Sequence, residues 1–276
     1  MKSLSAGTMR DRLEIKVVVK GGGEMATGVV HRLVRSGLRV CITEIPTPLA
    51  VRREVAFCEA VFDGQKEVEG MIARRVGDEK EVRGAWDEGR IPLLVDPECK
   101  IRKVLKPQVL VDAIMAKRNI GTRMGDASLV IGLGPGFHAG KDVHLVVETN
   151  RGHNLGRVIE EGEAEPDSGI PGEIRGYTWE RVLRAPGSGR LLANKKIGDP
   201  VKKGEQVARV EGAVIEAGID GVLRGILRDG FSVHQGMKVG DIDPRGTRAH
   251  CFTISDKARA VGGGVLEAIL MGYGQL

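Results

Sequence analysis

The chain has 276 residues, of which 41% are hydrophobic and 29% charged, enough apolar material for one large or two small packed cores. The formal net charge is +5, but Lys and Arg are interleaved with Asp and Glu along the chain, so no nucleic-acid-binding surface is predicted. Aromatic residues make up only 3%, too few for a platform that stacks single-stranded bases.

The spacing of the cysteines and the length of the apolar runs indicate in which compartment the protein is expected. The four cysteines show no C-x-x-C spacing, so we expect reduced thiols and no metal site. No apolar run approaches the roughly 20 residues that span a bilayer, and the first residues lack the apolar core of a signal peptide. We therefore expect a cytoplasmic protein that does not insert into membranes.

The first predicted unit is a strand, a Gly-rich turn, a helix and a second strand. Residues 13–20 form a β-branched run that ends at three consecutive glycines, which predicts a buried strand. Apolar residues recur at helical spacing over residues 25–36, and Gly37 follows as a C-terminal cap. Residues 38–43 then predict the second, parallel strand of a βαβ unit.

Strand and helix patterns continue to alternate further along the chain. Strands are predicted at residues 55–62, 68–76, 92–95, 109–114, 129–131 and 144–147, with short helices at residues 80–88 and 101–105. This alternation predicts an α/β fold in which residues 1–165 form a Rossmann-like, nucleotide-binding domain with a mostly parallel sheet.

An internal repeat follows a Pro-, Gly- and acid-rich stretch that begins after Gly162. Seven residues recur 32 positions further on: Ala185, Gly189, Leu191, Gly198, Val201, Gly204 and Val207 match Ala217, Gly221, Leu223, Gly230, Val233, Gly236 and Val239. Residues 180–245 with their two 32-residue repeats resemble the all-β barrel-sandwich hybrid of biotinyl and lipoyl carriers. Such carriers present a Lys between the halves, and because no Lys occurs at residues 205–237, no covalent biotin or lipoate is expected.

Residues 246–276 are predicted to form a short strand and a C-terminal helix that pack back on the first domain. The helix contains Gly262, Gly263 and Gly264, and each Gly costs a helix roughly 1 kcal/mol relative to Ala. The three glycines therefore mark either a break in the helix or a close contact.

The Gly-rich turn after the first strand carries the clearest binding motif. Gly21, Gly23 and Ala26 form G-x-G-x-x-A, in which small residues let backbone amides and a helix N-terminus approach a phosphate. Glu44 ends the second strand, where an acid accepts a ribose 2′-hydroxyl and favours NAD or FAD over NADP. The predicted cofactor-binding residues here are Gly21, Gly23, Ala26, Thr27, Gly28 and Glu44. The alternative is a structural turn beside a solvated acid.

A second group of anion-binding candidates follows two later strands. Gly132, Gly134 and Gly136 form a turn whose backbone amides could reach an anionic group. Lys117 and Arg118 lie after a strand, on the side where open α/β sheets bind ligands. A structural turn and a solvated charged surface are the alternatives.

Catalytic motifs are scarce, and no catalytic residue is assigned. The chain has no G-x-S-x-G elbow, no Walker motif and no recognisable pair of carboxylates, so hydrolase and kinase activities are not predicted. His138, His144 and His153 lack the spacing of a helical metal pair. One of them would have to donate a proton if the chain were an oxidoreductase.

Five longer motifs carry a resemblance to a known family. They are KGGGEMATG at residues 20–28, VDAIMAKRN at 111–119, IGLGPGF at 131–137, ETNRGH at 148–153 and CFTISDK at 251–257. Together they resemble the YqeB family, described as accessory proteins of selenium-dependent molybdenum hydroxylases. Gly22 and Glu24 depart from the residues expected in the first turn. The resemblance implies a role in hydroxylase maturation and supplies no catalytic residues.

Three functions therefore stay open. The first is an accessory protein that binds a nucleotide or the dinucleotide form of molybdopterin, with a molybdenum hydroxylase or another maturation factor as its partner. The second is an NAD-dependent oxidoreductase that acts on a small substrate. The third is a non-catalytic scaffold. Whether the chain forms a homo-oligomer is also open.

Overall fold

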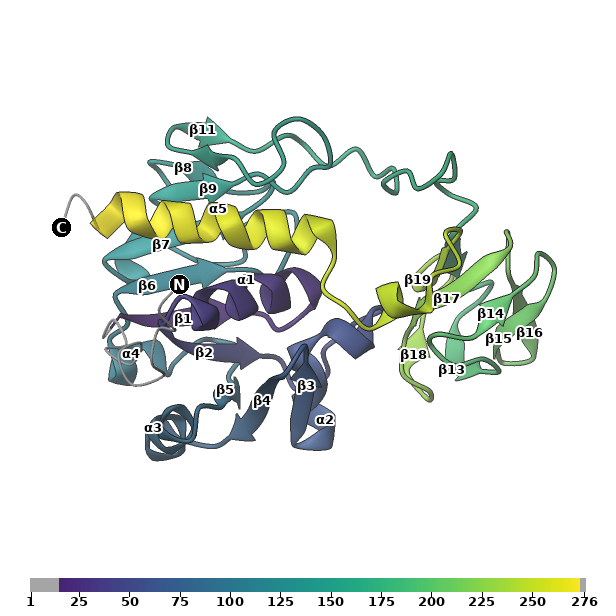
Figure 1. Ribbon diagram of the computed structural model, residues 1–276, viewed down its shortest axis with the longest axis horizontal. Helices are drawn as coiled ribbons and strands as arrows, with labels where there is room; N and C mark the ends of the chain where they lie inside the picture. Colours follow the sequence, from purple (N-terminus) through teal and green to yellow (C-terminus); the bar gives the residue numbers. More distant parts are fainter. Residues whose placement is uncertain (1–14, 274–276) are drawn as a thin grey trace, which may run out of the picture.

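The computed structural model describes residues 15–273 (Figure 1), so residues 1–14 and 274–276 of the predicted ranges lie outside the described residues. Nine strands form the largest sheet: β1 (Lys16–Lys20), β2 (Arg39–Glu44), β3 (Gln65–Val68), β4 (Met71–Val76), β5 (Ile91–Val95), β6 (Val109–Asp112), β7 (Leu129–Leu133), β9 (Leu145–Val147) and β10 (Val158–Ile159). Their order is β10-β9-β7-β6-β1-β2-β5-β4-β3. The edge strands β3 and β10 are antiparallel to their neighbours, and the other pairs are parallel.

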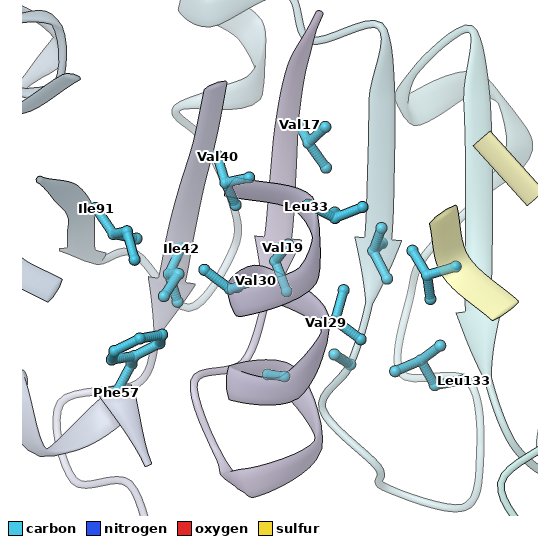
Figure 2. Packing of buried hydrophobic residues seen from close by; sticks show 14 of the residues in the cluster. Val17, Val19, Val29, Val30, Leu33, Val40, Ile42, Phe57, Ile91 and Leu133 are labelled. Atoms are coloured by element: carbon cyan, nitrogen blue, oxygen red, sulfur yellow. The ribbon is translucent and has the colours of Figure 1, made fainter. Parts of the chain in front are cut away.

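Helices cover both faces of this sheet because its central strands are apolar on both sides. In β1, Val17 and Val19 belong to one buried cluster and Val18 to another. The first cluster lies under α1 (Glu24–Arg35) and α5 (Asp256–Tyr273), and the second under α3 (Glu79–Asp87) and α4 (Arg102–Leu105). Figure 2 shows the first cluster, in which α1 packs on β1 and β2 through Val29, Val30, Leu33, Val17, Val19, Val40 and Ile42.

α1 and α5 lie side by side (Figure 1), and glycines allow their close approach. A Cβ atom at Gly28 would lie 2.6 Å from the carbonyl oxygen of Ala258, and one at Gly262 would lie 2.8 Å from that of Gly28 and near Arg32. The helices therefore run in the same direction. α5 continues unbroken through its three glycines, which provide a close contact rather than a break.

Eight further strands form two four-stranded antiparallel sheets: β12 (Val182–Arg184), β13 (Gly189–Ala193), β14 (Pro200–Val201), β15 (Gln206–Val210), β16 (Ala213–Glu216), β17 (Gly221–Ile226), β18 (Ser232–Val233) and β19 (Lys238–Asp243). The orders are β12-β19-β17-β14 and β16-β15-β13-β18. β13 and β17 begin 32 positions apart. When each strand is replaced by the strand 32 positions away in the chain, the order of one sheet becomes the order of the other. Each sheet therefore takes two strands from each repeat.

The predicted fold class, a Rossmann-like domain followed by a barrel-sandwich-hybrid-like domain and a C-terminal helix, is wrong. The chain is a mixed α/β protein whose large sheet has antiparallel strands at both edges, accompanied by antiparallel sheets. A two-stranded sheet of β8 (His138–Ala139) and β11 (Gly162–Glu163) adds to them. Alternating strand and helix patterns do not reveal strand direction, because a hairpin such as β3–β4, which turns at Glu69 and Gly70 with positive φ, has the same apolar pattern as one longer strand.

Two segments also differ in secondary structure from the prediction. Residues 55–62 form parts of the 3₁₀ turns η1 (Arg53–Val55) and η2 (Phe57–Glu59) and of α2 (Ala60–Asp63) rather than a strand, because their apolar side chains are buried on all sides. The short strand predicted in residues 246–276 is absent from residues 251–255, because Cys251 ends the 3₁₀ turn η4 (Arg248–Cys251) and α5 begins at Asp256. A further 3₁₀ turn, η3 (Met124–Asp126), precedes β7. None of the helices within residues 15–273 is long and apolar enough to cross a membrane.

Candidate functional site

A cleft of about 570 Å³ opens at the carboxyl ends of the parallel strands. Gly21 after β1, Glu44 at the end of β2 and Ala113 after β6 line it. β2 and β6 flank β1 on opposite sides, and open α/β sheets bind ligands where the strand order reverses in this way. One antiparallel sheet, β12-β19-β17-β14, closes the cleft with Arg224 and Lys238, so the cleft lies between the two parts of the molecule.

The cleft is positively charged. Six cationic and four acidic side chains line it, which leaves a surplus of two positive charges. The cations are Arg52, Arg151, Arg181, Arg224, Lys238 and Lys257, and the acids are Glu24, Glu44, Asp167 and Asp241. Such a lining attracts anions and raises their local concentration.

Glu24, the first residue of α1, neutralises one of these cations. Its carboxylate pairs with Arg52 and accepts a hydrogen bond of 2.7 Å from Ser255 Oγ. Burial alone would raise the pKa of Glu24, but Arg52, Ser255 and Arg224 bring it below its usual value. Arg52 also donates to the carbonyl oxygens of His250 (2.7 Å) and Thr253 (3.2 Å), so it fixes the segment that leads into α5.

Arg224 on β17 is a buried cation of the cleft with an incomplete set of hydrogen bonds. Its side chain is 7% exposed, and Nε has no hydrogen-bond partner among residues 15–273. The carboxylate of Asp243 lies 3.7 Å from Nε but already accepts hydrogen bonds of 2.9 and 2.6 Å from Arg245. Burial and the charge of Arg52 lower the pKa of Arg224. The Nε atom itself has almost no accessible surface, so an anion in the cleft would interact with the charge of the guanidinium rather than with Nε.

Lys257 stands in the first turn of α5 and also faces the cleft. No hydrogen bond or salt bridge joins its side chain to another residue of the described range 15–273. Burial and the neighbouring charge of Arg151 lower the pKa of Lys257. Because α1 and α5 run parallel, both helix N-termini, with their partial positive charges, lie at this end of the cleft.

Glu44 lines the cleft beside the turn that leads into α1. The carboxylate of Glu44 accepts hydrogen bonds from the backbone amides of Gly22 (2.8 Å) and Ile45 (2.7 Å). Burial raises the pKa of Glu44 despite these bonds. Beyond it, Ile45 and Leu49 are 46% and 54% exposed, so a flat ring would find an apolar surface beside an acceptor.

Of the first group of predicted site residues, the structure brings Gly21, Gly23 and Glu44 to the cleft. Ala26, Thr27 and Gly28 are buried in α1. The hydroxyl oxygen of Thr27 accepts a hydrogen bond of 3.0 Å from the amide of Phe57. Gly28 contacts α5 instead of facing the cleft.

The second group lies outside the main cleft. Lys117 pairs with Asp167 and, with Pro135, lines a second cavity of about 500 Å³. Gly132, Gly134 and Gly136 make room for neighbouring groups, because Cβ atoms there would overlap the Phe137 ring, the Thr149 hydroxyl and the Arg118 backbone, respectively. Neither Arg118 nor these glycines line the cleft.

Arg52, Arg224 and Lys257 are the functional candidates that sequence reasoning missed. They come from a turn, the repeat and the last helix, so no local spacing joins them. The motif at residues 251–257 contains Lys257 and the motif at residues 20–28 contains Glu24, which is the signal that could have drawn attention to them.

The thiol of the cleft and the three candidate histidines show no arrangement for covalent or metal chemistry within residues 15–273. Burial raises the pKa of the cleft thiol Cys58 well above its usual value, so the thiol stays protonated at neutral pH. His144 accepts a hydrogen bond of 2.9 Å from Val130, and neither it nor His138 or His153 lines the cleft. Within residues 15–273, no three His, Cys, Asp or Glu side chains gather as a metal site would require.

Solved structures give only distant fold likenesses. They include an aspartoacylase family protein from Mesorhizobium loti (10% identity, 77% of this chain and 59% of that one, TM-score 0.24). A second is the ectoine utilization protein EutE (DoeB) from Ruegeria pomeroyi (11% identity, 83% of this chain and 85% of that one, TM-score 0.27). A third is a succinylglutamate desuccinylase from Silicibacter sp. TM1040 (12% identity, 83% of this chain and 84% of that one, TM-score 0.26). No family model matches the chain.

A sequence relative is much closer. The chain is 49% identical over 255 residues, 92% of its length, to the protein named Uncharacterized protein YqeB of Escherichia coli (strain K12). It spans 47% of that protein's length. This similarity supports the resemblance to the YqeB family that the five motifs carry.

Proposed function

We propose that this chain is an accessory protein of molybdenum hydroxylase maturation that binds a nucleotide, or the dinucleotide form of a molybdopterin cofactor, in the cleft. The maturation role rests on the resemblance of the motifs to YqeB proteins. Ligand binding rests above all on Lys257, whose side chain lines the cleft and makes no hydrogen bond or salt bridge within residues 15–273. A molybdenum hydroxylase or another of its maturation factors would receive the ligand.

The proposed binding mode assigns each part of a nucleotide to a different group of residues in the cleft lining. A flat ring lies against Ile45 and Leu49, and a ribose hydroxyl donates to Glu44. The phosphates accept hydrogen bonds from Arg224 and Lys257 and lie at the N-termini of α1 and α5. The residues present therefore fit the anionic part of a molybdopterin dinucleotide as well as that of a common nucleotide.

No structural observation favours the oxidoreductase alternative. It requires a proton donor beside the nicotinamide, and the three candidate histidines lie away from the cleft. The scaffold alternative predicts that no ligand stabilises the chain.

A thermal-shift screen tests the proposal. We would use NAD, NADP, FAD, CDP, CTP, ATP and molybdopterin cytosine dinucleotide with the wild type and Gly23→Val. A ligand at about 100 times its Kd adds about 2.7 kcal/mol, or roughly 5–10 °C in Tm. A Cβ at Gly23 meets nothing within 4 Å, so the Val side chain should occupy the cleft without disturbing the fold.

Gly84→Ala in α3 is the matched control, because a Cβ there also meets nothing within 4 Å and the site is remote from the cleft. We expect at least one ligand to raise the Tm of the wild type and of Gly84→Ala, but not that of Gly23→Val. A flat screen for the wild type would contradict ligand binding and favour the scaffold.

A further inference from the structure

We propose that the ligand is a diphosphate diester with a large group on each phosphate, bound across two adjoining cavities and without a divalent cation. This inference rests on the proposed function and narrows the class of ligand. It assigns the second cavity, the one lined by Lys117 and Pro135, to the second half of the ligand.

The two cavities meet at a cationic junction. The main cleft of about 570 Å³ and the second cavity of about 500 Å³ share six lining residues: Met115, Asn150, Asp167, Ile170, Lys238 and Lys257. Lys257 therefore faces both cavities from the N-terminus of α5. A ligand with its charge in the middle and bulky groups at both ends matches this arrangement, whereas a mononucleotide would occupy one cavity.

The charge of the cleft matches a diphosphate diester. The main cleft has a surplus of two positive charges. Two further charged residues pair with lining residues from outside it: Lys117 pairs with Asp167, and Asp256 pairs with Arg151. Because one is positive and the other negative, counting them leaves the surplus at two. A diphosphate diester carries about two negative charges, one per phosphate, whereas a nucleoside triphosphate carries about four. The triphosphate would exceed the available positive charge unless a metal ion accompanied it.

The acids of the cleft are already engaged, so they offer no place for that metal ion. Glu24 pairs with Arg52, Asp241 with Arg181, and Asp167 with Lys117. Glu44 accepts hydrogen bonds from two backbone amides. Arg224 and Lys257, which lack hydrogen-bond partners within the described part of the chain, supply the positive charge instead.

The second cavity has the lining that a large end group needs. The segment that covers it contains Pro166, Ile170 and Pro171. Asn150 and Asn154 donate to Glu165 (2.6 and 3.1 Å), which fixes the start of this segment. Across the cavity Met115 adds an apolar surface and Thr149 a polar one, so a ring and a hydroxyl-bearing group both find contacts.

Titration calorimetry of the full chain tests the inference. The probes are AMP, ADP-ribose, FAD, molybdopterin cytosine dinucleotide and ATP, each in EDTA and in Mg²⁺. We expect ADP-ribose to bind at least tenfold more tightly than AMP, with the same Kd in both buffers. ATP should bind more weakly than ADP-ribose in EDTA. The diphosphate diester with the lowest Kd shows which end groups the two cavities accept best.

Two variants measure separately how much the junction and the second cavity contribute to ligand affinity. Lys257→Met should weaken ADP-ribose tenfold or more, since it removes a charge-assisted hydrogen bond, whereas Lys203→Met on an exposed turn should change nothing. Pro171→Trp, which lines only the second cavity, should weaken ADP-ribose and FAD but leave AMP unchanged. Circular dichroism would confirm that each variant is folded.

The outcomes separate this inference from the proposed function. Equal affinities for AMP and ADP-ribose, a requirement for Mg²⁺, or an unaffected Pro171→Trp would overturn the inference while nucleotide binding stands. Failure of every probe, AMP included, would overturn both.

Discussion

Two glycines in the paired helices α1 and α5 are expected to respond to Ala in opposite directions. Both substitutions remove a helix penalty of about 1 kcal/mol. A Cβ at Gly263 meets nothing within 4 Å, so Gly263→Ala should stabilise the protein by up to that amount. A Cβ at Gly28 would lie 2.6 Å from the carbonyl oxygen of Ala258, whereas ordinary contacts begin at 3.4 Å.

The helices would therefore have to separate by about 0.8 Å to accept Gly28→Ala, which weakens van der Waals contacts along the interface. Overpacking of this kind costs about 1–3 kcal/mol, and the contact with rigid backbone places Gly28→Ala at the upper end. After the helix gain, we expect a net loss of about 2 kcal/mol. The two variants should then differ by about 3 kcal/mol.

Urea unfolding followed by far-ultraviolet circular dichroism measures this difference, and Tm should differ by roughly 6–12 °C between the variants. Equal stabilisation by both substitutions would refute the close packing of α1 on α5. It would also remove the reason for placing both helix N-termini at the cleft.

The remaining predictions concern two buried ion pairs and the proposed binding of an anion in the cleft. Arg181→Met should cost about 3 kcal/mol because it leaves the buried Asp241 with only the more distant Lys238, 3.7 Å away, and Asp241→Leu in the same chain should recover most of this loss in urea unfolding. Burial raises the pKa of Asp243, but Arg245 and Arg224 bring it below its usual value. The stabilisation is therefore present at neutral pH and is lost as the pH falls below about 4, so the stability gap between wild type and Asp243→Asn should narrow there. Ligand affinity should fall as salt rises in calorimetric titrations.

The beginning of the fold could be predicted from the sequence because its signals are local. The β-branched run, the glycines and the apolar helical spacing of residues 16–44 each fix backbone geometry within a few residues, and β1, α1 and β2 form there. Strand direction depends on partners distant in the chain, so the edge hairpin of β3 and β4 was missed. The roles of the glycines were also hidden, since Gly28 contacts a helix that begins at Asp256.

Only part of the candidate site could be predicted for the same reason. Gly21, Gly23 and Glu44 follow two adjacent strands, and motif spacing relates them. Arg224 and Lys257 reach the cleft only through the packing of the repeat and of α5 against the first part of the chain. Charged residues are usually solvated, so sequence gives no sign that one of them is buried without a hydrogen-bond partner.

The 32-residue repeat provides two related sheets, but only one of them contacts the cleft. Arg224 on β17 corresponds to Leu192 on β13, and Asp241 on β19 corresponds to Arg209 on β15. Arg224 is buried in the cleft, whereas Leu192 is 44% exposed to solvent. The core positions of the two repeats are alike, while the positions that line the cleft differ. Duplication has thus produced two similar sheets, of which only β12-β19-β17-β14, built from strands of both copies, lines the cleft.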